Sequence, residues 1–276
     1  PTMDCSICIL APKMSDVGHH PNIELLTNSE VVEVKGYIGN FHVKALKKPR
    51  YVTKDCSACD ECAKVCPIVA PNEFDAGLAI RHAIYTPFAQ AVPSTYTIDM
   101  NICLNKDGVI VCDKCMKACE RQAIKFEMKP ETIELEVGTI IVATGADVFD
   151  PSTLPNYGYG KHPNIITSLE FERLINAGGP SGGRLIRPSD MQIPKRVAFI
   201  QCVGSRSEKN GRLYCSNVCC MNTIKDSLLI KEHWPDTEIY VFYVDIRAYG
   251  KGFEDLYKRA RKEGVVFIRG LPAEII

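Results

Sequence analysis

The part of the chain from residue 196 onward alternates short apolar runs with longer amphipathic stretches. Strands are predicted at 196–201, 238–244 and 265–269, and helices at Cys219–His233 and 252–263. Strands that alternate with helices of about 10–15 residues are typical of a parallel sheet with right-handed crossovers. This region is therefore predicted to be a βαβαβ unit.

The N-terminal region favours strands of another kind. Residues 23–26, 30–34 and 41–46 are rich in β-branched side chains, and the last run alternates apolar with polar positions. Alternation with a period of two is typical of a half-buried strand. We expect a small antiparallel meander between residues 23 and 52.

The middle of the chain is less regular. The stretch 54–126 is rich in cysteine and predicts only short helices. Strands are predicted at 132–135 and 139–143. A loop-rich region follows, with one predicted helix at 168–176 that Ser168 would cap.

Composition narrows the class of protein. Of 276 residues, 46% are hydrophobic, and 33 Lys plus Arg balance 33 Asp plus Glu. A nucleic-acid surface or a polybasic membrane patch needs a clustered excess of charge, so neither partner is expected. No run approaches the roughly 18 apolar residues of a membrane span. The chain starts at Pro1 without a signal-peptide pattern, and we expect its true N-terminus upstream.

The 14 cysteines are the unusual feature, and most lie in groups two to four residues apart. Such bunching suits a metal centre held by several thiolates, whereas disulfides constrain the unfolded chain most when they close long loops. We therefore expect metal-bound thiolates in a reducing compartment, and so a cytoplasmic protein.

The first cysteine block has the spacing Cys-x2-Cys-x2-Cys-x3-Cys-Pro. It consists of Cys56, Cys59, Cys62, Cys66 and Pro67. In bacterial ferredoxins three cysteines of such a run bind one [4Fe–4S] cluster and the fourth binds another. The spacing suits this chemistry because three thiolates on a tight loop can all point at one cluster.

A second block repeats this arrangement with a longer gap after its first cysteine and with Glu120 in place of proline. Its members are Cys103, Cys112, Cys115 and Cys119. Cross-ligation assigns one cluster to Cys56, Cys59, Cys62 and Cys119, and the other to Cys66, Cys103, Cys112 and Cys115. Two zinc sites are the alternative, but zinc favours two separated Cys-x2-Cys pairs.

The remaining cysteines form two groups. Cys5 and Cys8 make half a site, and no metal is assigned to them. The other group lies at the turn between the strand 196–201 and the next helix, and consists of Cys202, Cys215, Cys219 and Cys220.

A dinucleotide-binding fold would carry G-x-G-x-x-G at this turn, but residues 201–206 keep only Gly204. A helix N-terminus attracts anionic groups, and a thiolate-bound cluster is anionic. We therefore predict a third [4Fe–4S] cluster at these four cysteines, with buried free thiols as the alternative.

The run 138–145 ends in Ala143, Thr144 and Gly145. It resembles the strand-and-glycine motif of two-dinucleotide-domain flavoproteins such as thioredoxin reductase. The resemblance implies that these small residues approach FAD, whose glycine fingerprint would lie upstream of Pro1.

Nearly the whole chain resembles the A subunit of heterodisulfide reductase, the iron–sulfur flavoprotein of methanogen-type heterodisulfide reductases. The motifs that carry the resemblance span 4–14, 20–23, 91–96, 167–172, 201–206, 214–221 and 245–252. In that family the set Cys202, Cys215, Cys219 and Cys220 is expected to bind a cluster.

The resemblance implies an α/β fold, a thioredoxin-reductase-like flavoprotein with an inserted α+β ferredoxin domain that carries two [4Fe–4S] clusters. The implied domains are 1–51 and 132–190 within the FAD domain, 52–131 as the ferredoxin insertion, and 191–276 as a Rossmann-like domain with a cysteine-rich first turn.

The function implied by the resemblance is that of an oxidoreductase subunit in methanogenesis. It would relay electrons, and with FAD bifurcate them, between a hydrogenase or dehydrogenase donor, ferredoxin and a disulfide-reducing partner subunit. Disulfide reduction is expected on that partner, so no catalytic residue is assigned here, and a homo-oligomer within the complex is expected.

Two other functions are weighed against this one. The first is a ferredoxin-like electron-wiring module without bound flavin, in a different redox complex. The second is a stand-alone NAD(P)H-dependent disulfide reductase, which the missing glycine fingerprint at 201–206 disfavours.

Overall fold

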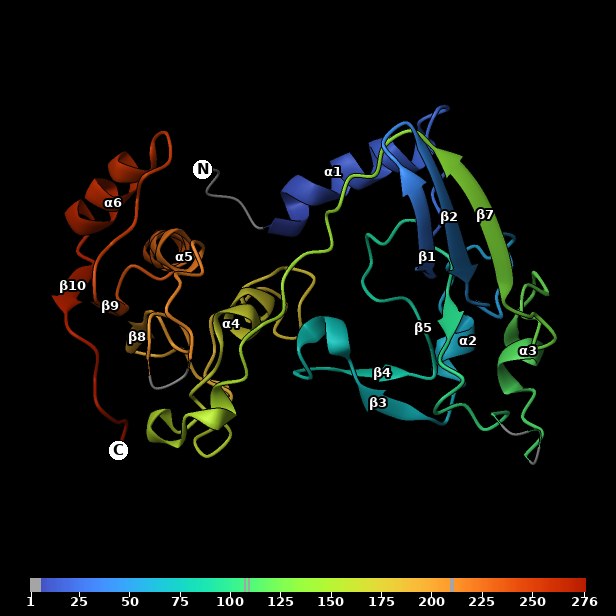
Figure 1. Ribbon diagram of the computed structural model, residues 1–276. Helices are drawn as coiled ribbons and strands as arrows, with labels where there is room; N and C mark the ends of the chain where they lie inside the picture. The colour runs from blue at the N-terminus through green and yellow to red at the C-terminus, as the bar shows by residue number, and fades with distance from the viewer. Residues whose placement is uncertain (1–5, 107, 109, 209–210) are drawn as a thin grey trace. The chain divides into compact units, whose positions relative to one another are not determined.

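The computed structural model describes residues 6–106, 108, 110–208 and 211–276. The described residues divide into two compact units, 6–145 and 146–276 (Figure 1). Each unit mixes helices with strands, so the α/β class is confirmed, whereas the thioredoxin-reductase-like fold and the domain boundaries stay predictions. Within the described ranges, every helix is too short or too polar to traverse a lipid bilayer.

The first unit begins with a helix that was not predicted, α1 (Ser6–His19). It contains Pro12, a residue that removes a backbone hydrogen bond inside a helix, and none of its residues is buried. The strand predicted at 23–26 is wrong. These residues lie between two turns, and Ile23 and Leu25 are each 44% exposed. A β-branched run forms a strand only where another strand pairs with it.

Three strands form an antiparallel sheet in the order β1-β2-β7, namely β1 (Ser29–Tyr37), β2 (Asn40–Lys47) and β7 (Glu131–Val137). Val34 pairs with Val43, which in turn pairs with Leu135. This register gathers apolar side chains on one face. The other face is charged, with Lys44 Nζ 3.0 Å from Glu134 Oε1. The other strand predictions of this region, apart from 139–143, are confirmed.

Between β2 and β7 the chain forms only short elements, which are α2 (Glu61–Lys64), β3 (Val69–Pro71), the 3-10 helix η1 (Glu73–Asp75), β4 (Ile80–His82), β5 (Ile84–Tyr85), β6 (Thr97–Ile98) and α3 (Lys114–Ala118). Strand β3 pairs with β4, and β5 pairs with β6. Val52, Ile84, Ile98 and Ile124 form a small core against which several cysteines pack. The short helices predicted for this stretch are confirmed.

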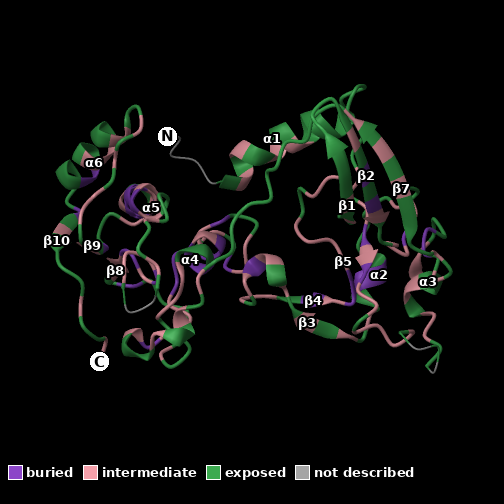
Figure 2. Cartoon of the chain, viewed as in Figure 1, coloured by how far each residue is buried: buried purple, intermediate pink, exposed green. Residues whose placement is uncertain are grey.

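The second unit contains the 3-10 helices η2 (Pro151–Thr153) and η3 (Pro155–Tyr157), then α4 (Ser168–Leu174), β8 (Arg196–Ile200), α5 (Cys219–His233), β9 (Glu238–Tyr243), α6 (Phe253–Lys262) and β10 (Val266–Arg269). Its strands form a parallel sheet in the order β10-β9-β8. Helix α5 buries Ile224, Leu228 and Ile230 in one core with Ile239 and Val241 (Figure 2). The predicted parallel βαβαβ unit is confirmed.

The strand predicted at 139–143 is wrong. The segment after β7 has no regular structure, and Ile141 and Val142 are 88% and 77% exposed. None of the strands in the described ranges pairs with it. The run is apolar, but no strand of the described ranges lies beside it. Its backbone N–H and C=O groups therefore form no sheet hydrogen bonds.

Helix α4 is shorter than predicted, and its cap is Thr167, not Ser168. The Glu170 N–H donates to Thr167 Oγ1 at 3.2 Å, and the Thr167 N–H donates to Glu170 Oε2 at 2.5 Å. These two bonds form a capping box, which satisfies two backbone donors reciprocally. The helix ends at Leu174.

Candidate metal centres

Backbone pairing brings the two ends of the cysteine-rich region together. Residues 51–53 run antiparallel to residues 123–125, with N–H···O distances of 2.7 and 2.9 Å. Cys56 follows the first segment closely, and Cys119 precedes the second. This pairing therefore brings Cys119, the last cysteine of the second block, toward Cys56, the first cysteine of the first block.

A second chain of backbone bonds connects Cys66 with Cys103. The Ala83 N–H donates to Ile68 O at 3.3 Å, the Asp99 N–H donates to Ala83 O at 2.8 Å, and the Cys103 N–H donates to Asp99 O at 3.1 Å. Because Cys66 lies two residues before Ile68, the fourth cysteine of the first block lies near the first cysteine of the second.

A pocket lies where these segments meet, with about 360 Å³ of empty space including its open mouth. The cysteines that line it are Cys66, Cys103, Cys112 and Cys115. These are the four residues that cross-ligation assigned to one cluster. Ile84, Ile98 and Phe126 make part of the wall apolar. Four thiolates around an apolar pocket fit a [4Fe–4S] cluster, which takes one thiolate per iron.

The other predicted set is also partly gathered. Cys62, on α2, is buried and shares a core with the half-buried Cys56 and Cys119, whereas Cys59 is exposed. Burial, together with the charges of Cys56 and Cys115, raises the pKa of Cys62 to about 12. The Ala123 N–H donates to Cys119 Sγ at 3.4 Å.

Burial acts on the pKa of two of the pocket thiols as well, Cys103 and Cys115. Burial raises the pKa of Cys115 to about 11, and the charges of Cys103 and Cys112 act in the same direction. Metal binding to such thiols displaces their protons. Among the described residues, no three His, Cys, Asp or Glu side chains are gathered closely enough for a single metal ion. A cluster is compatible with wider spacing, because each thiolate binds a different iron.

The turn after β8 gathers the third predicted set. Cys202 has a φ of 59°, in the left-handed region that few residues other than glycine adopt. Cys219 and Cys220 are the first residues of α5. The close approach of these three sulfur atoms lowers the pKa of Cys219 and raises the pKa of Cys202 and Cys220. The charge of Cys215 acts on Cys220 as well.

The loop at Cys215 has the same local geometry as the ferredoxin-like loop at Cys56. The Asn217 N–H donates to Cys215 Sγ at 3.4 Å, and the Ala58 N–H donates to Cys56 Sγ at 3.4 Å. Asn217 and Ala58 have φ values of 61° and 55°. In both loops the second residue after the cysteine therefore turns its N–H toward sulfur, a contact that stabilises a thiolate and tunes a cluster potential.

Arg206 and Asp245 form an ion pair at the same turn, which was not predicted from the sequence. The two guanidinium N–H···O distances are 2.5 and 3.1 Å, and this cation lowers the pKa of Asp245. Arg206 also interacts with Cys202, and the Cys220 thiol donates to Asp245 O at 3.8 Å. The sequence offered one signal for this ion pair, which is that Arg206 lies in a turn that also carries cysteines.

The residues predicted to approach FAD lie in the segment that follows β7, and their contact with FAD stays a prediction. Ala143, Thr144 and Gly145 are all exposed in the irregular segment after β7. The N-terminal pair is Cys5 and Cys8, to which no metal was assigned. Cys8 is exposed on α1, and Cys5 lies outside the described residues.

No model of a known protein family matches the chain. Curated relatives, however, match it from end to end. It is 59% identical to the A subunit of the H(2):CoB-CoM heterodisulfide,ferredoxin reductase of Methanothermobacter thermautotrophicus. It is 56% identical to the iron-sulfur A subunit of the CoB--CoM heterodisulfide reductase of Methanocaldococcus jannaschii. The chain is homologous over its whole length to the A subunit of heterodisulfide reductase.

The predicted resemblance to this iron–sulfur subunit of heterodisulfide reductase is therefore confirmed. A third relative, at 48% identity, is the A subunit of the Ferredoxin/F(420)H(2)-dependent CoB-CoM heterodisulfide reductase of Methanosarcina acetivorans. The chain spans 41% of the length of the first two relatives and 34% of the third. It therefore aligns with one portion of each of these longer relatives.

Proposed function

We propose that this chain is the cluster-bearing portion of a heterodisulfide reductase A subunit that relays electrons within an oxidoreductase complex. One observation carries the proposal. The pocket is lined by cysteines of both blocks, in the combination that cross-ligation requires, Cys66, Cys103, Cys112 and Cys115. The names of the relatives, which are reductase subunits, support the same class of activity.

The proposal assigns three [4Fe–4S] clusters. Their ligands are Cys56, Cys59, Cys62 and Cys119 for the first, Cys66, Cys103, Cys112 and Cys115 for the second, and Cys202, Cys215, Cys219 and Cys220 for the third. When bound, such clusters supply one-electron transfer. The chain itself would supply the cysteine thiolates, an apolar wall at the second site, and N–H donors to sulfur from Ala58, Ala123 and Asn217.

The proposed partners rest on the resemblance to this family, and the relatives' names, which mention ferredoxin and H(2) or F(420)H(2), support a multi-subunit redox complex. They are a hydrogenase or dehydrogenase donor, ferredoxin, and a subunit on which the disulfide is reduced, assembled in the cytoplasm with more than one copy of this subunit. FAD contact at Ala143, Thr144 and Gly145, and electron bifurcation, are proposed only for the full-length subunit, because the relatives are longer than this chain.

One observation favours the flavin-free alternative. Ala143, Thr144 and Gly145 are exposed and outside any strand. In the flavin-free alternative this segment would contact no FAD, and the chain would act as an electron-wiring module. Flavin content separates the two functions, because only the first requires FAD to copurify with the full-length subunit.

The experiment that tests the cluster assignment is anaerobic measurement of iron, acid-labile sulfide and zinc per chain. The wild type should hold about 12 irons, and Cys112→Ala and Cys202→Ala about 8 each. Leu213→Ala is the matched control, because Leu213 is 71% exposed between Cys202 and Cys215. A wild type with about 8 irons, unchanged by Cys202→Ala, would remove the third cluster. Zinc in place of iron would overturn the whole proposal.

A further inference from the structure

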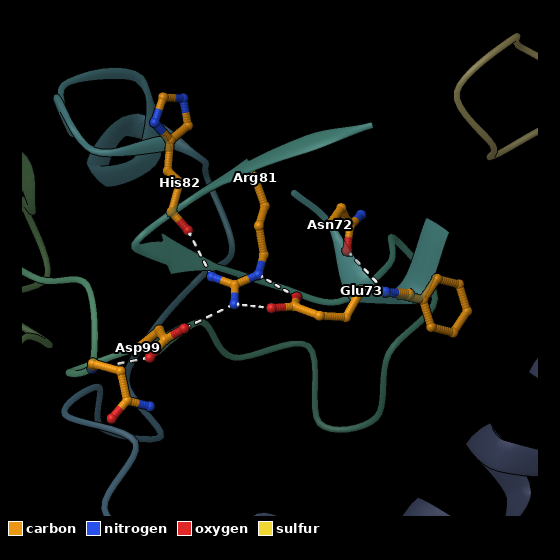
Figure 3. A network of polar contacts seen from close by, with 7 residues as sticks. Asn72, Glu73, Arg81, His82 and Asp99 are labelled. Atoms are coloured by element: carbon orange, nitrogen blue, oxygen red, sulfur yellow. Dashed lines mark hydrogen bonds and ion pairs between the residues drawn. The ribbon is translucent and has the colours of Figure 1, made fainter. Parts of the chain in front are cut away.

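Arg81, on β4, is a buried cation with only 6% of its side chain exposed. Figure 3 shows its guanidinium between two carboxylates. Nε and Nη2 each lie 2.6 Å from a carboxylate oxygen of Glu73, and Nη2 also lies 2.8 Å from Asp99 Oδ2. Nη1 donates to His82 O at 3.3 Å, and the guanidinium stacks 4.0 Å from the ring centre of Tyr85.

These contacts differ from those of an ordinary surface ion pair. The Asp99 side chain is 17% exposed, whereas that of Glu73 is 69% exposed. A buried charge is tolerated where hydrogen bonds satisfy it, and every nitrogen of this guanidinium has a partner. Removal of Arg81 would therefore leave the enclosed Asp99 carboxylate uncompensated.

Asp99 begins the turn that ends at Cys103. Its Oδ1 accepts the Asn101 N–H at 3.0 Å, and its backbone carbonyl accepts the Cys103 N–H at 3.1 Å. Cys103 lines the candidate cluster pocket. The backbone bond between Asp99 and Cys103 closes this turn, so the Asp99 carboxylate and the Cys103 thiol belong to the same short segment.

We propose that Arg81 is a positioning residue for the cluster held by Cys66, Cys103, Cys112 and Cys115. By binding Asp99 it fixes the turn that presents Cys103, and by neutralising Asp99 it holds the reduction potential of this site above the value that a bare carboxylate would impose. The inference rests on the proposed function, because it requires a cluster in this pocket.

The sign of the effect follows from Coulomb interaction. Reduction adds a negative charge to the site, which a nearby carboxylate opposes and a nearby cation favours. Arg81→Gln should therefore make reduction about tenfold less favourable, which is about 59 mV for one electron. Asp99→Asn leaves the cation in place and keeps an oxygen for the Asn101 N–H, so it should shift the potential upward.

Opposite shifts are the signature of this role. A merely structural role would lose iron, or shift the potential in one direction for both variants. Arg81→Lys retains the charge and should bring the potential back toward the wild-type value. Lys48→Gln is the control, because Lys48 pairs with Glu30 at 2.7 Å on the exposed end of the sheet. It should leave every potential unchanged.

The measurement is a redox titration of the anaerobically loaded full-length chain, followed by electron paramagnetic resonance, with iron counted in each sample. A lower potential in Arg81→Gln, a higher one in Asp99→Asn and no change in Lys48→Gln support the proposal. Unchanged potentials, or shifts of the same sign, at wild-type iron content overturn it and leave the cluster assignment intact. Equal iron in wild type and Cys112→Ala would instead refute the proposed function, and with it this inference.

Discussion

Gly204 is the one glycine that remains of the dinucleotide fingerprint, and the structure gives it a different role. Its φ is 75°, and a Cβ atom there would lie 2.4 Å from ring carbons of Phe149. Gly204→Ala therefore combines two costs. The left-handed backbone disfavours a Cβ by about 1–2 kcal/mol, and the overlap with the ring adds about 1–3 kcal/mol. We expect a loss of about 2–5 kcal/mol in the free energy of unfolding.

Gly160 is a matched control within the same unit. It has the same φ of 75°, but an added Cβ would meet no atom within 4 Å. Gly160→Ala should therefore show the backbone cost alone, about 1–2 kcal/mol. The difference between the two variants isolates the contact with Phe149.

The assay is urea unfolding followed by the fluorescence of Trp234. The chain has one tryptophan. It lies directly after α5, so the signal reports on the unit 146–276. In a Phe149→Ala background, Gly204→Ala should cost no more than Gly160→Ala, because the clash has been removed. Equal losses for the two glycine variants in the wild-type background would refute the argument.

Two further predictions concern stability. Tyr96 is buried and donates to Asp60 Oδ1 at 2.6 Å, so Tyr96→Phe should lower the free energy of unfolding by about 1.5–3 kcal/mol. Burial and this bond raise the pKa of Tyr96, so its contribution is present below its ordinary pKa near 10 and lost at higher pH. The difference in phenolate absorbance between wild type and Tyr96→Phe isolates this phenol, and a difference that titrates near pH 10 would contradict the prediction. Leu228→Ala, at a fully buried position, should cost about 2–5 kcal/mol in urea unfolding, against less than about 0.5 kcal/mol for the exposed Leu213→Ala. Similar losses would show that the α5 core is not packed as described.

The second unit could be predicted from the sequence because its signals are local. The helix Cys219–His233 has the predicted limits, and β8 and β9 each end one residue before the predicted limit. The cysteine spacing was equally informative, since fixed intervals along the chain specify which thiolates share a loop. Such patterns are read within a window of a few residues.

The failures depend on residues that are distant in the sequence. The run 139–143 has a strand-like composition, but whether it pairs depends on other strands. The contact of Arg81 with Asp99 joins positions 18 residues apart, across two short sheets. The α1 helix, for which no prediction was made, includes Pro12, a residue that disfavours a helix interior. Pairing partners and buried ion pairs are properties of the folded chain, and no local pattern encodes them.

The register of β2 against β7 has a consequence for how this protein can be rebuilt. Lys47, the last residue of β2, lies opposite Glu131, the first residue of β7. The whole cysteine-rich stretch between them therefore departs from and returns to neighbouring strands, about 4.8 Å apart. Such adjacent ends are the usual condition for transplanting a segment between proteins. A hairpin loop of about two to five residues could join the same two strand ends. The cysteine-rich stretch could therefore be replaced by such a loop, or inserted between two strands of another sheet, without a change in the strand register.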